Sequence, residues 1–238
     1  MAHRGLHDSA LGIIENTSSA VEAAIEGNFG IEVDVQLAGD GEVMVFHDYT
    51  LDRLTDMRGA LLSKPACEIQ CARFKKGTDR IQTLTELLEQ VDGRAPLIIE
   101  AKAQWATPGI LETRLAQIVR RYTGPIAVMS FDPQSVRYMR EYAPNVTRGI
   151  TIENFHYGEE WNKVLNLPRR LSLRHMNELN AADPQFAAIY VKDLPNAPSR
   201  LFKKRGLPVL SWTVRTKTDR ERAIRFADQI IFEGFRPD

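Results

Sequence analysis

The sequence is short of three features that define large classes of proteins: cysteine, net charge and long apolar runs. It has two cysteines among 238 residues, and its 31 basic and 31 acidic side chains cancel. A disulfide-stapled scaffold is therefore excluded, and nonspecific attraction to nucleic acid or lipid headgroups has no electrostatic support. The apolar runs are far shorter than the roughly 18 residues that a membrane-spanning helix needs. We expect no nucleic-acid partner and no stable membrane insertion.

The amino-terminal segment also lacks the features of an export signal. Residues 1–5 contain no apolar stretch of the kind found in signal peptides, so we expect a cytoplasmic protein. Cys67 and Cys71 are four positions apart, with no histidine or carboxylate placed nearby to complete a zinc site. We therefore predict that both are ordinary reduced thiols.

Strand-like and helix-like segments alternate along almost the whole chain. The strand-like segments are Phe29–Leu37, Val43–His47, Pro96–Lys102, Pro125–Phe131, Val146–Ile152, Ala187–Val191, Pro208–Val214 and Asp228–Glu233. Helix-like spacing is found at Asn16–Glu26, Leu84–Val91, Ile110–Tyr122, Pro133–Tyr142, Arg169–Asn180, Ser199–Arg205 and Thr218–Ala227. This alternation predicts a parallel sheet. Roughly eight repeats in a chain of this length predict a closed TIM (β/α)8 barrel, and an open doubly wound sheet is the alternative.

Residues 51–80 interrupt this alternation. The segment is long and polar and contains both cysteines, and loops of such length are often functional or cover a site. We interpret it as an insertion after the second strand region, within a single barrel domain that spans residues 1–238.

The segment Gly30–Leu37 carries the most informative pattern. Apolar residues at odd positions alternate with Glu32, Asp34 and Gln36, so the two sets face opposite sides of a strand. In a barrel whose helices cover the apolar side, the two carboxylates point into the barrel mouth. Like charges that are buried together require a cation or strong hydrogen bonds. A half-exposed antiparallel strand, which needs no metal, explains this segment alone equally well.

A further carboxylate favours the metal site. Residues 97–99 are apolar, and Glu100 and Lys102 follow on one face at the carboxyl end of the strand, where barrel enzymes hold their active sites. Together with Glu32 and Asp34, Glu100 completes a set of oxygen ligands that suits Mg²⁺ or Ca²⁺ rather than zinc. A surface ion pair between Glu100 and Lys102 is the simpler alternative.

Two of the five histidines stand where proton transfer is chemically reasonable. His47 ends an apolar strand-like run, and His3 lies at the start of the chain. Imidazole titrates near neutral pH, which suits general acid–base catalysis. A structural role is the alternative for either histidine, and we assign that role to His7, His156 and His175.

A series of short motifs follows a fixed order along the chain. The first are His3-Arg4-Gly5, Glu15-Asn16-Thr17, Ile31-Glu32-Val33-Asp34-Val35, Asp40-Gly41, His47-Asp48 and Leu51-Asp52-Arg53-Leu54-Thr55. Later ones are Thr83-Leu84, Ile99-Glu100-Ala101-Lys102, Ser130-Phe131-Asp132, Ser211-Trp212-Thr213-Val214 and Arg236-Pro237-Asp238. In this order and spacing the chain resembles the glycerophosphodiester phosphodiesterase family. The resemblance implies a TIM barrel that hydrolyses glycerophosphodiesters to glycerol 3-phosphate and an alcohol.

The resemblance also implies a role for each residue of the site. His3 and His47 correspond to the general acid and base pair, and one divalent cation, Mg²⁺ or Ca²⁺, binds to Glu32, Asp34 and Glu100. The phosphate contacts are Arg4 and Lys102, the walls of the pocket are Phe131 and Trp212, and the supporting residue is Glu15. Charge complementarity at a helix amino terminus is the alternative explanation for Glu15.

These roles suit the hydrolysis of a phosphodiester. Arginine and lysine bind phosphate oxygens, and a cation neutralises the charge that develops during attack. One imidazole removes a proton from the nucleophile, and the other protonates the leaving alkoxide. The nucleophile is water or the glycerol 2-hydroxyl, which would form a cyclic intermediate, and either histidine can be the base.

Two other functions remain open for this sequence. One is a related barrel phosphodiesterase for another head group, of the phospholipase D or inositol-lipid type, which an exposed apolar lip or basic rim would favour. The other is a non-catalytic barrel that binds a phosphorylated metabolite. The presence of every acid–base and acidic position argues against the second.

Two positions depart from the family pattern. Glu233 stands where the family usually has Thr-Asp, and Arg215 stands where the family often has Asn after the Trp212 motif. Both are predicted at strand carboxyl ends, so both bear on the choice of leaving group. As a hypothesis, the extra cation at Arg215 favours a substrate with a second anionic group.

Overall fold

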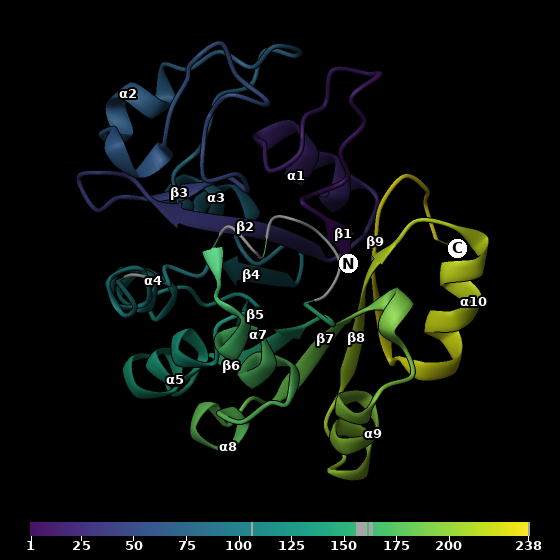
Figure 1. Ribbon diagram of the computed structural model, residues 1–238. Coiled ribbons are helices and arrows are strands. Elements are labelled where there is room, and N and C mark those ends of the chain that lie inside the picture. The colour runs from purple at the N-terminus through teal and green to yellow at the C-terminus, as the bar shows by residue number, and fades with distance from the viewer. Residues whose placement is uncertain (106, 156–160, 162–163, 238) are drawn as a thin grey trace.

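The computed structural model describes residues 1–105, 107–155, 161 and 164–237. Within these residues, eight parallel strands close into a barrel in the order β1-β2-β4-β5-β6-β7-β8-β9, with β9 returning to β1 (Figure 1). The strands are β1 (Ala2–His3), β2 (Ile31–Leu37), β4 (Leu97–Ala101), β5 (Ile126–Ser130), β6 (Thr147–Ile152), β7 (Phe186–Tyr190), β8 (Val209–Val214) and β9 (Gln229–Phe232). The predicted TIM barrel is confirmed, and the open doubly wound alternative is wrong.

Helices surround the barrel, as Figure 1 shows. They are α1 (Ser18–Glu26), α3 (Leu84–Val91), α4 (Ile110–Val119), α5 (Pro133–Tyr142), α7 (Leu167–Arg174), α8 (Leu179–Ala182), α9 (Ala197–Lys204) and α10 (Lys217–Phe226). Short 3-10 turns are formed by η1 (Leu61–Ser63) and η2 (Val191–Asp193). Among the described residues, no helix is long and apolar enough to cross a membrane.

The alternation within β2 separates an apolar layer from a charged one. Ile31, Val33 and Val35 are buried in a core that includes residues of α1 and α3, which is the predicted helix-facing side. The opposite faces of the strands line the barrel interior, which is apolar at Ile98. Two residues further along β4, the same face carries the buried Glu100. The carboxyl ends of the strands therefore meet in a charged layer above an apolar floor.

The segment predicted as the second strand lies outside the barrel. β3 (Val43–Val45) covers part of the predicted Val43–His47 strand, but it pairs antiparallel with β2 as the partner of a hairpin. The place in the barrel is taken by β1, whose Ala2 pairs with both Ile31 and Phe232 and so closes the barrel. A strand of two residues is too short to show an alternating pattern in the sequence.

The predicted helix at Arg169–Asn180 is also divided. α7 ends at Arg174 and α8 begins at Leu179. Between them Met176 adopts a left-handed conformation with φ of 55°, which cannot continue a right-handed helix. The helical spacing of apolar residues continues across this break, so the break cannot be predicted from that spacing. His156 and Asp238 lie outside the described residues.

The inserted segment, residues 51–80, has a core of its own beneath its polar composition. It contains η1 and α2 (Ala66–Gln70), and it packs beside β3 through Met44 and Phe46. The buried apolar side chains that the segment contributes are Leu51, Leu61, Ala66, Ile69, Ala72 and Phe74. Cys67 and Cys71 are exposed and free, in agreement with the prediction for the thiols.

Candidate active site

The predicted site residues gather at the carboxyl ends of the barrel strands. Most of them line one cavity of about 550 Å³. Its lining consists of His3, Arg4, Asp34, His47, Asp48, Tyr49, Thr50, Glu100, Lys102, Phe131, Glu153, Trp161, Val164 and Trp212. Glu32 and Glu15 lie behind this lining, in contact with Arg4. The structure thus brings all ten predicted residues to one end of the barrel.

Three carboxylates from two adjacent strands form the buried centre of the site. The register of β2 and β4 sets Asp34 opposite Glu100, and Glu32 lies two residues earlier on the same face of β2. Each of the three offers an oxygen, and these oxygens lie within 4.8 Å of one another. Asn16 fixes Asp34 from above, because it donates to Asp34 Oδ2 at 3.0 Å and accepts from the Asp34 amide at 3.1 Å. The acidic cluster is therefore held rigidly by the sheet and by the loop before α1.

Two cations enter this acidic cluster. Lys102 Nζ lies 3.0 Å from Glu100 Oε1 and 3.5 Å from Asp34 Oδ1. Arg4 Nε lies 3.3 Å from Asp34 Oδ2 on the other side. Burial opposes the charge on Lys102, but Glu100 and Asp34 outweigh it, so the pKa of the ammonium is raised. Lys102 therefore stays charged at neutral pH.

The three carboxylates do not share this compensation equally. Burial alone would raise the pKa of Asp34, but the charges of His47, Lys102 and Arg4 hold it well below its usual range. The pKa of Glu32, in contrast, is raised well above normal by burial and by the charges of its acidic neighbours. Arg4 and Lys102 supply two positive charges against three carboxylates, and Glu32 is the member whose ionisation is opposed.

Each of the two imidazoles is held by a carboxylate at Nδ1. His3 Nδ1 lies 2.6 Å from Glu233 Oε2, and His47 Nδ1 lies 2.7 Å from Asp48 Oδ1. A carboxylate accepts the Nδ1 proton, so Nε2 is the nitrogen left to exchange a proton with a substrate. Burial lowers the pKa of His3, although the hydrogen bond to Glu233 opposes this. Both imidazoles are thus oriented by a partner, as general acids and bases require.

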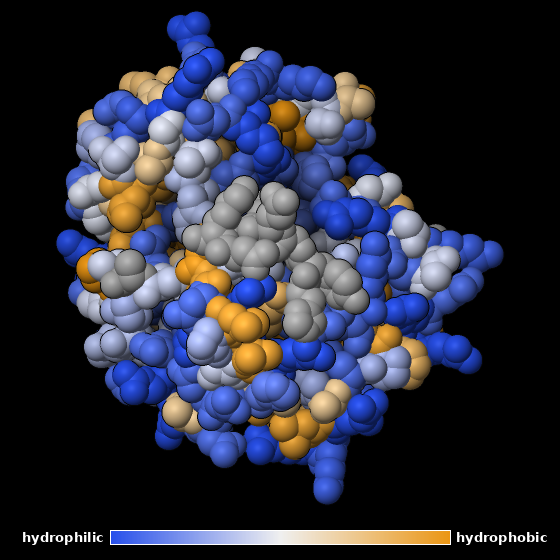
Figure 2. Space-filling view, viewed as in Figure 1, coloured by the Kyte–Doolittle hydropathy of each residue, from blue (hydrophilic) through white to orange (hydrophobic). Residues whose placement is uncertain are grey.

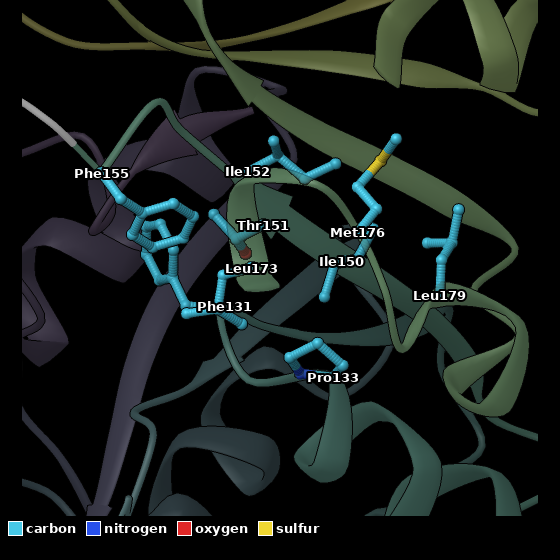
Figure 3. Close-up of a pocket in the computed structure, with 9 residues that line it drawn as sticks. All are labelled: Phe131, Pro133, Ile150, Thr151, Ile152, Phe155, Leu173, Met176 and Leu179. Atoms are coloured by element: carbon cyan, nitrogen blue, oxygen red, sulfur yellow. The ribbon is translucent and has the colours of Figure 1, made fainter. Parts of the chain in front are cut away.

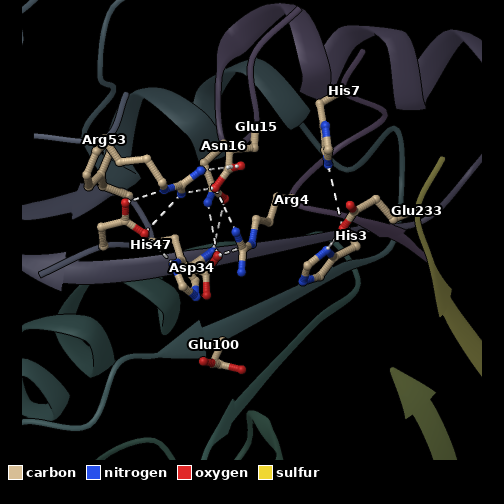
Figure 4. A network of polar contacts seen from close by, with 12 residues as sticks. His3, Arg4, His7, Glu15, Asn16, Asp34, His47, Arg53, Glu100 and Glu233 are labelled. Atoms are coloured by element: carbon tan, nitrogen blue, oxygen red, sulfur yellow. Dashed lines mark hydrogen bonds and ion pairs between the residues drawn. The ribbon is translucent and has the colours of Figure 1, made fainter. Parts of the chain in front are cut away.

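Glu15 links the arginines of the site. It accepts from Arg4 Nη1 at 2.7 Å and from Arg53 at 2.7 and 3.1 Å, and Arg53 also donates to Asp48 at 2.5 and 3.0 Å (Figure 4). The contacts therefore run from Arg4 through Glu15 and Arg53 to Asp48, the partner of His47. Glu15 precedes the first turn of α1, and its oxygens bind two guanidinium groups rather than the helix end.

Aromatic side chains form the other side of the cavity. The rings of Phe131 and Trp212 meet edge to face with centroids 5.4 Å apart, and Trp161 lies 5.2 Å from Phe131. The Trp212 indole donates to the Ala188 carbonyl at 3.0 Å, which fixes the ring on β8. The Trp161 indole donates to Glu153, which lies just beyond β6. The cavity is therefore charged on one side and apolar on the other.

A second, smaller cavity lies behind the aromatic side (Figure 3). It measures about 20 Å³ and is lined by Phe131, Pro133, Ile150, Thr151, Ile152, Phe155, Leu173, Met176 and Leu179. Its volume is about that of one water molecule, and its lining carries no charged group. It is a packing defect rather than a substrate site.

Several residues of the site had no assigned function in the sequence. Asn16, Asp48 and Arg53 stand inside the motifs of the resemblance, and that position was the available signal. Glu153 and Trp161 lie after β6, in a part of the chain without strand or helix periodicity, so no pattern indicated them. The contacts of Arg215, which donates to Glu233 at 3.1 and 2.9 Å, depend on a side-chain pairing that spacing does not encode.

The chain is similar to proteins of known family along nearly its whole length. The family model described as "Glycerophosphoryl diester phosphodiesterase family" matches residues 3–235. A glycerophosphodiester phosphodiesterase of Caldanaerobacter subterraneus subsp. tengcongensis is 31% identical, with 94% of this chain and 89% of the relative covered. One of Bacillus altitudinis is 30% identical, with 69% and 71% covered.

Solved structures show the same architecture at lower sequence identity. A phosphodiesterase from Oleispira antarctica in complex with the product sn-glycerol-3-phosphate superposes with a TM-score of 0.79 at 20% identity, covering 98% of this chain and 91% of that one. A glycerophosphodiester phosphodiesterase from Thermotoga maritima gives 0.73 at 23% identity, covering 98% and 92%. These likenesses support the barrel fold.

Proposed function

Because the chain belongs to the glycerophosphoryl diester phosphodiesterase family and is a phosphoric diester hydrolase, we propose that it cleaves glycerophosphodiesters with a divalent cation and two histidines. The cation binds to Glu32, Asp34 and Glu100. His3 and His47 are the acid–base pair, and Arg4 and Lys102 bind the phosphate. The products are glycerol 3-phosphate and an alcohol.

One observation carries this proposal: a single cavity is bordered by both imidazoles, by two carboxylates of the acidic cluster, Asp34 and Glu100, and by the cations of Arg4 and Lys102. His3, His47, Arg4 and Lys102 all border its volume of about 550 Å³, which lies within the range of small-molecule sites. The aromatic side offers an apolar surface for the glycerol or the leaving alcohol. A phosphodiester that enters this cavity meets complementary charge on one side and apolar contact on the other.

The acidic cluster fits a hard divalent cation. Its donors are carboxylate oxygens, its members are within 4.8 Å of one another, and Glu32 resists ionisation without further positive charge nearby. Oxygen donors of this kind suit Mg²⁺ or Ca²⁺. When bound, such a cation neutralises negative charge on the phosphoryl oxygens and on the nucleophile.

The chain's own residues move the protons. Arg4 and Lys102 hold phosphate oxygens by charge-assisted hydrogen bonds. The nucleophile, water or the glycerol 2-hydroxyl, gives its proton to one imidazole as its oxygen bonds to phosphorus. The bond from phosphorus to the alcohol oxygen breaks, and the other imidazole protonates that oxygen. Glu233 and Asp48 keep the Nδ1 proton of each ring in place, so that proton exchange occurs at Nε2.

A panel of glycerophosphodiesters tests this function directly. With Mg²⁺ or Ca²⁺ present, we expect the purified protein to release glycerol 3-phosphate from substrates such as glycerophosphocholine and glycerophosphoglycerol. Phosphorus NMR of the reaction follows substrate and product together, and a transient cyclic glycerophosphate signal identifies the 2-hydroxyl as nucleophile. Failure to release glycerol 3-phosphate from every member of the panel would refute the proposal.

An apolar lip favours a second candidate, a phosphodiesterase of the phospholipase D type for lysophospholipids. Val164 borders the cavity and is 44% exposed, and Leu167 and Leu171 on α7 are 54% and 39% exposed. Their spacing puts Leu167 and Leu171 on one face of the helix. The exposed Arg174 lies on the same face, at the end of α7. Figure 2 shows apolar surface where Figure 1 draws α7. An acyl chain on the leaving group could lie along this strip.

Replacing the strip separates the two candidates. If lysophospholipids are substrates, Leu167→Ser with Leu171→Ser should lower kcat/KM on lysophosphatidylcholine about 10-fold, as partial burial of two leucines predicts. The rate on glycerophosphocholine should not change. Ile224→Ser is the matched control, because Ile224 is 71% exposed on α10, far from the cavity lining. Absence of lysophospholipid hydrolysis by the wild-type protein would eliminate the second candidate.

A further inference from the structure

Glu233 and Arg215, the two residues that depart from the family pattern, lie in one row with His3 across three neighbouring strands. β9 pairs with β1 at Phe232 and Ala2, and β8 pairs with β9 at Val214 and Phe232. The residue that follows Ala2 is His3, the one that follows Phe232 is Glu233, and the one that follows Val214 is Arg215. The barrel register thus sets these three side chains beside one another, and of the three His3 borders the cavity.

Their contacts run in one direction, toward the imidazole. Arg215 Nε donates to Glu233 Oε1 at 3.1 Å and Arg215 Nη2 to Glu233 Oε2 at 2.9 Å, which is a two-point pair. Glu233 Oε2 also lies 2.6 Å from His3 Nδ1 and, more loosely, 3.9 Å from His7 Nε2. Burial opposes the charge of Glu233, but His3 and Arg215 outweigh it and hold the pKa of the carboxyl well below normal. Glu233 is therefore the acceptor, and the proton belongs to His3 Nδ1.

The same arrangement occurs at the other imidazole. His47 Nδ1 contacts Asp48 at 2.7 Å, and Asp48 receives two hydrogen bonds from Arg53 at 2.5 and 3.0 Å. Figure 4 shows His47 and Arg53 on one side of Asp34 and Arg4 in that view, and His3 and Glu233 on the other. Each imidazole in the cavity is thus hydrogen-bonded to a carboxylate, and each of these carboxylates is hydrogen-bonded to a guanidinium. A chance surface ion pair at Arg215 would not repeat this order.

We propose that Glu233 and Arg215 are positioning residues for His3. Glu233 fixes the ring so that Nδ1 carries the proton and Nε2 faces the substrate, and Arg215 fixes the rotamer of Glu233. This inference rests on the proposed function, in which His3 exchanges a proton with the substrate. It also assigns the charge of Arg215 to Glu233 rather than to a second anionic group on the leaving alcohol.

Steady-state kinetics of two variants test the assignment. Glu233→Gln should lower kcat about 10²-fold and Arg215→Asn about 10-fold, as loss of the partner of a functional histidine does elsewhere. KM should stay within about 2-fold, since neither residue is part of the cavity lining. The factor for Arg215→Asn should be equal for choline and anionic leaving groups. Lys217→Asn, which removes a nearby exposed cation, should change neither constant.

A double-mutant cycle separates positioning from general disturbance of the rim. In a His3→Ala background, Glu233→Gln should lower kcat by less than about 2-fold, because its effect passes through the imidazole. An equal loss in both backgrounds overturns the inference, as does a KM effect of Arg215→Asn confined to anionic leaving groups.

Nitrogen NMR tests the inference without reference to catalysis. The His3 ring should carry its proton at Nδ1 in the wild-type protein, and this tautomer should be lost in Glu233→Gln. A His3 ring protonated at Nε2 in the wild type would overturn the positioning role. If the His3 ring is protonated at Nδ1 as expected and no glycerophosphodiester is cleaved, the positioning role stands and the proposed function fails.

Discussion

His3→Ala and His47→Ala should each lower kcat on glycerophosphocholine by about 10²- to 10⁴-fold, the usual contribution of a positioned acid or base. In the proposed mechanism each imidazole handles one of two proton transfers, so the loss of either leaves a transfer to bulk water. KM should change little, because that mechanism assigns the phosphate contacts to Arg4 and Lys102. The measurement is the initial rate of glycerol 3-phosphate release at saturating Mg²⁺ or Ca²⁺.

The leaving group then distinguishes the two histidines. A p-nitrophenolate leaves without being protonated, so the variant that lacks the general acid should recover most of its rate on a p-nitrophenyl phosphodiester, whereas the variant that lacks the base should not. His175→Ala is the matched control, because His175 is exposed at the end of α7. Rates on glycerophosphocholine within about 3-fold of the wild type for either site variant would contradict acid–base catalysis.

The barrel could be predicted from the sequence because its strands are long enough to show a pattern. The seven residues of β2 alternate between a buried apolar face and a charged face, and that alternation has one explanation in a helix-covered sheet. The two residues of β1 give no period, so the strand that closes the barrel was not identified. Direction of pairing is equally invisible: β3 has apolar strand residues, but the turn after β2 makes it antiparallel.

The site could be predicted in part, for a related reason. Side chains that a strand places directly, such as Asp34 and Glu100, are fixed by register and by the alternation of the sheet. Partners that meet through tertiary contact are not. Glu233 and His3 are separated by nearly the whole chain, and their hydrogen bond depends on how β9 returns to β1. The sequence marked Glu233 as unusual, but only the closed barrel shows what it contacts.

Removal of divalent cations should abolish turnover, and addition of Mg²⁺ or Ca²⁺ should restore it. We expect EDTA-treated protein to fall to background with glycerophosphocholine, because the cation that would neutralise the charge developing on the phosphoryl oxygens is then absent. A titration of the treated protein with each cation, followed by rate and by calorimetry, gives the affinity and the preferred ion. Full activity after removal of bound metal would contradict the cation site.

Glu32→Gln distinguishes a ligand from a structural carboxylate. The amide keeps the shape of the side chain but removes its charge, so the affinity for the cation should fall about 10²-fold or more, since even partners of metal ligands contribute 10- to 100-fold. A bound cation raises Tm by mass action, and this rise should shrink in the variant. In EDTA, however, Tm should not fall, because burial and the charges of Asp34 and Glu100 oppose an ionised Glu32.

Glu112→Gln, at a buried carboxylate of α4 that receives a hydrogen bond from Ser135, should instead lower Tm and leave the cation affinity unchanged. A Glu32→Gln protein that unfolds early in EDTA and binds the cation normally would mean that Glu32 supports the barrel and that the ion is held elsewhere.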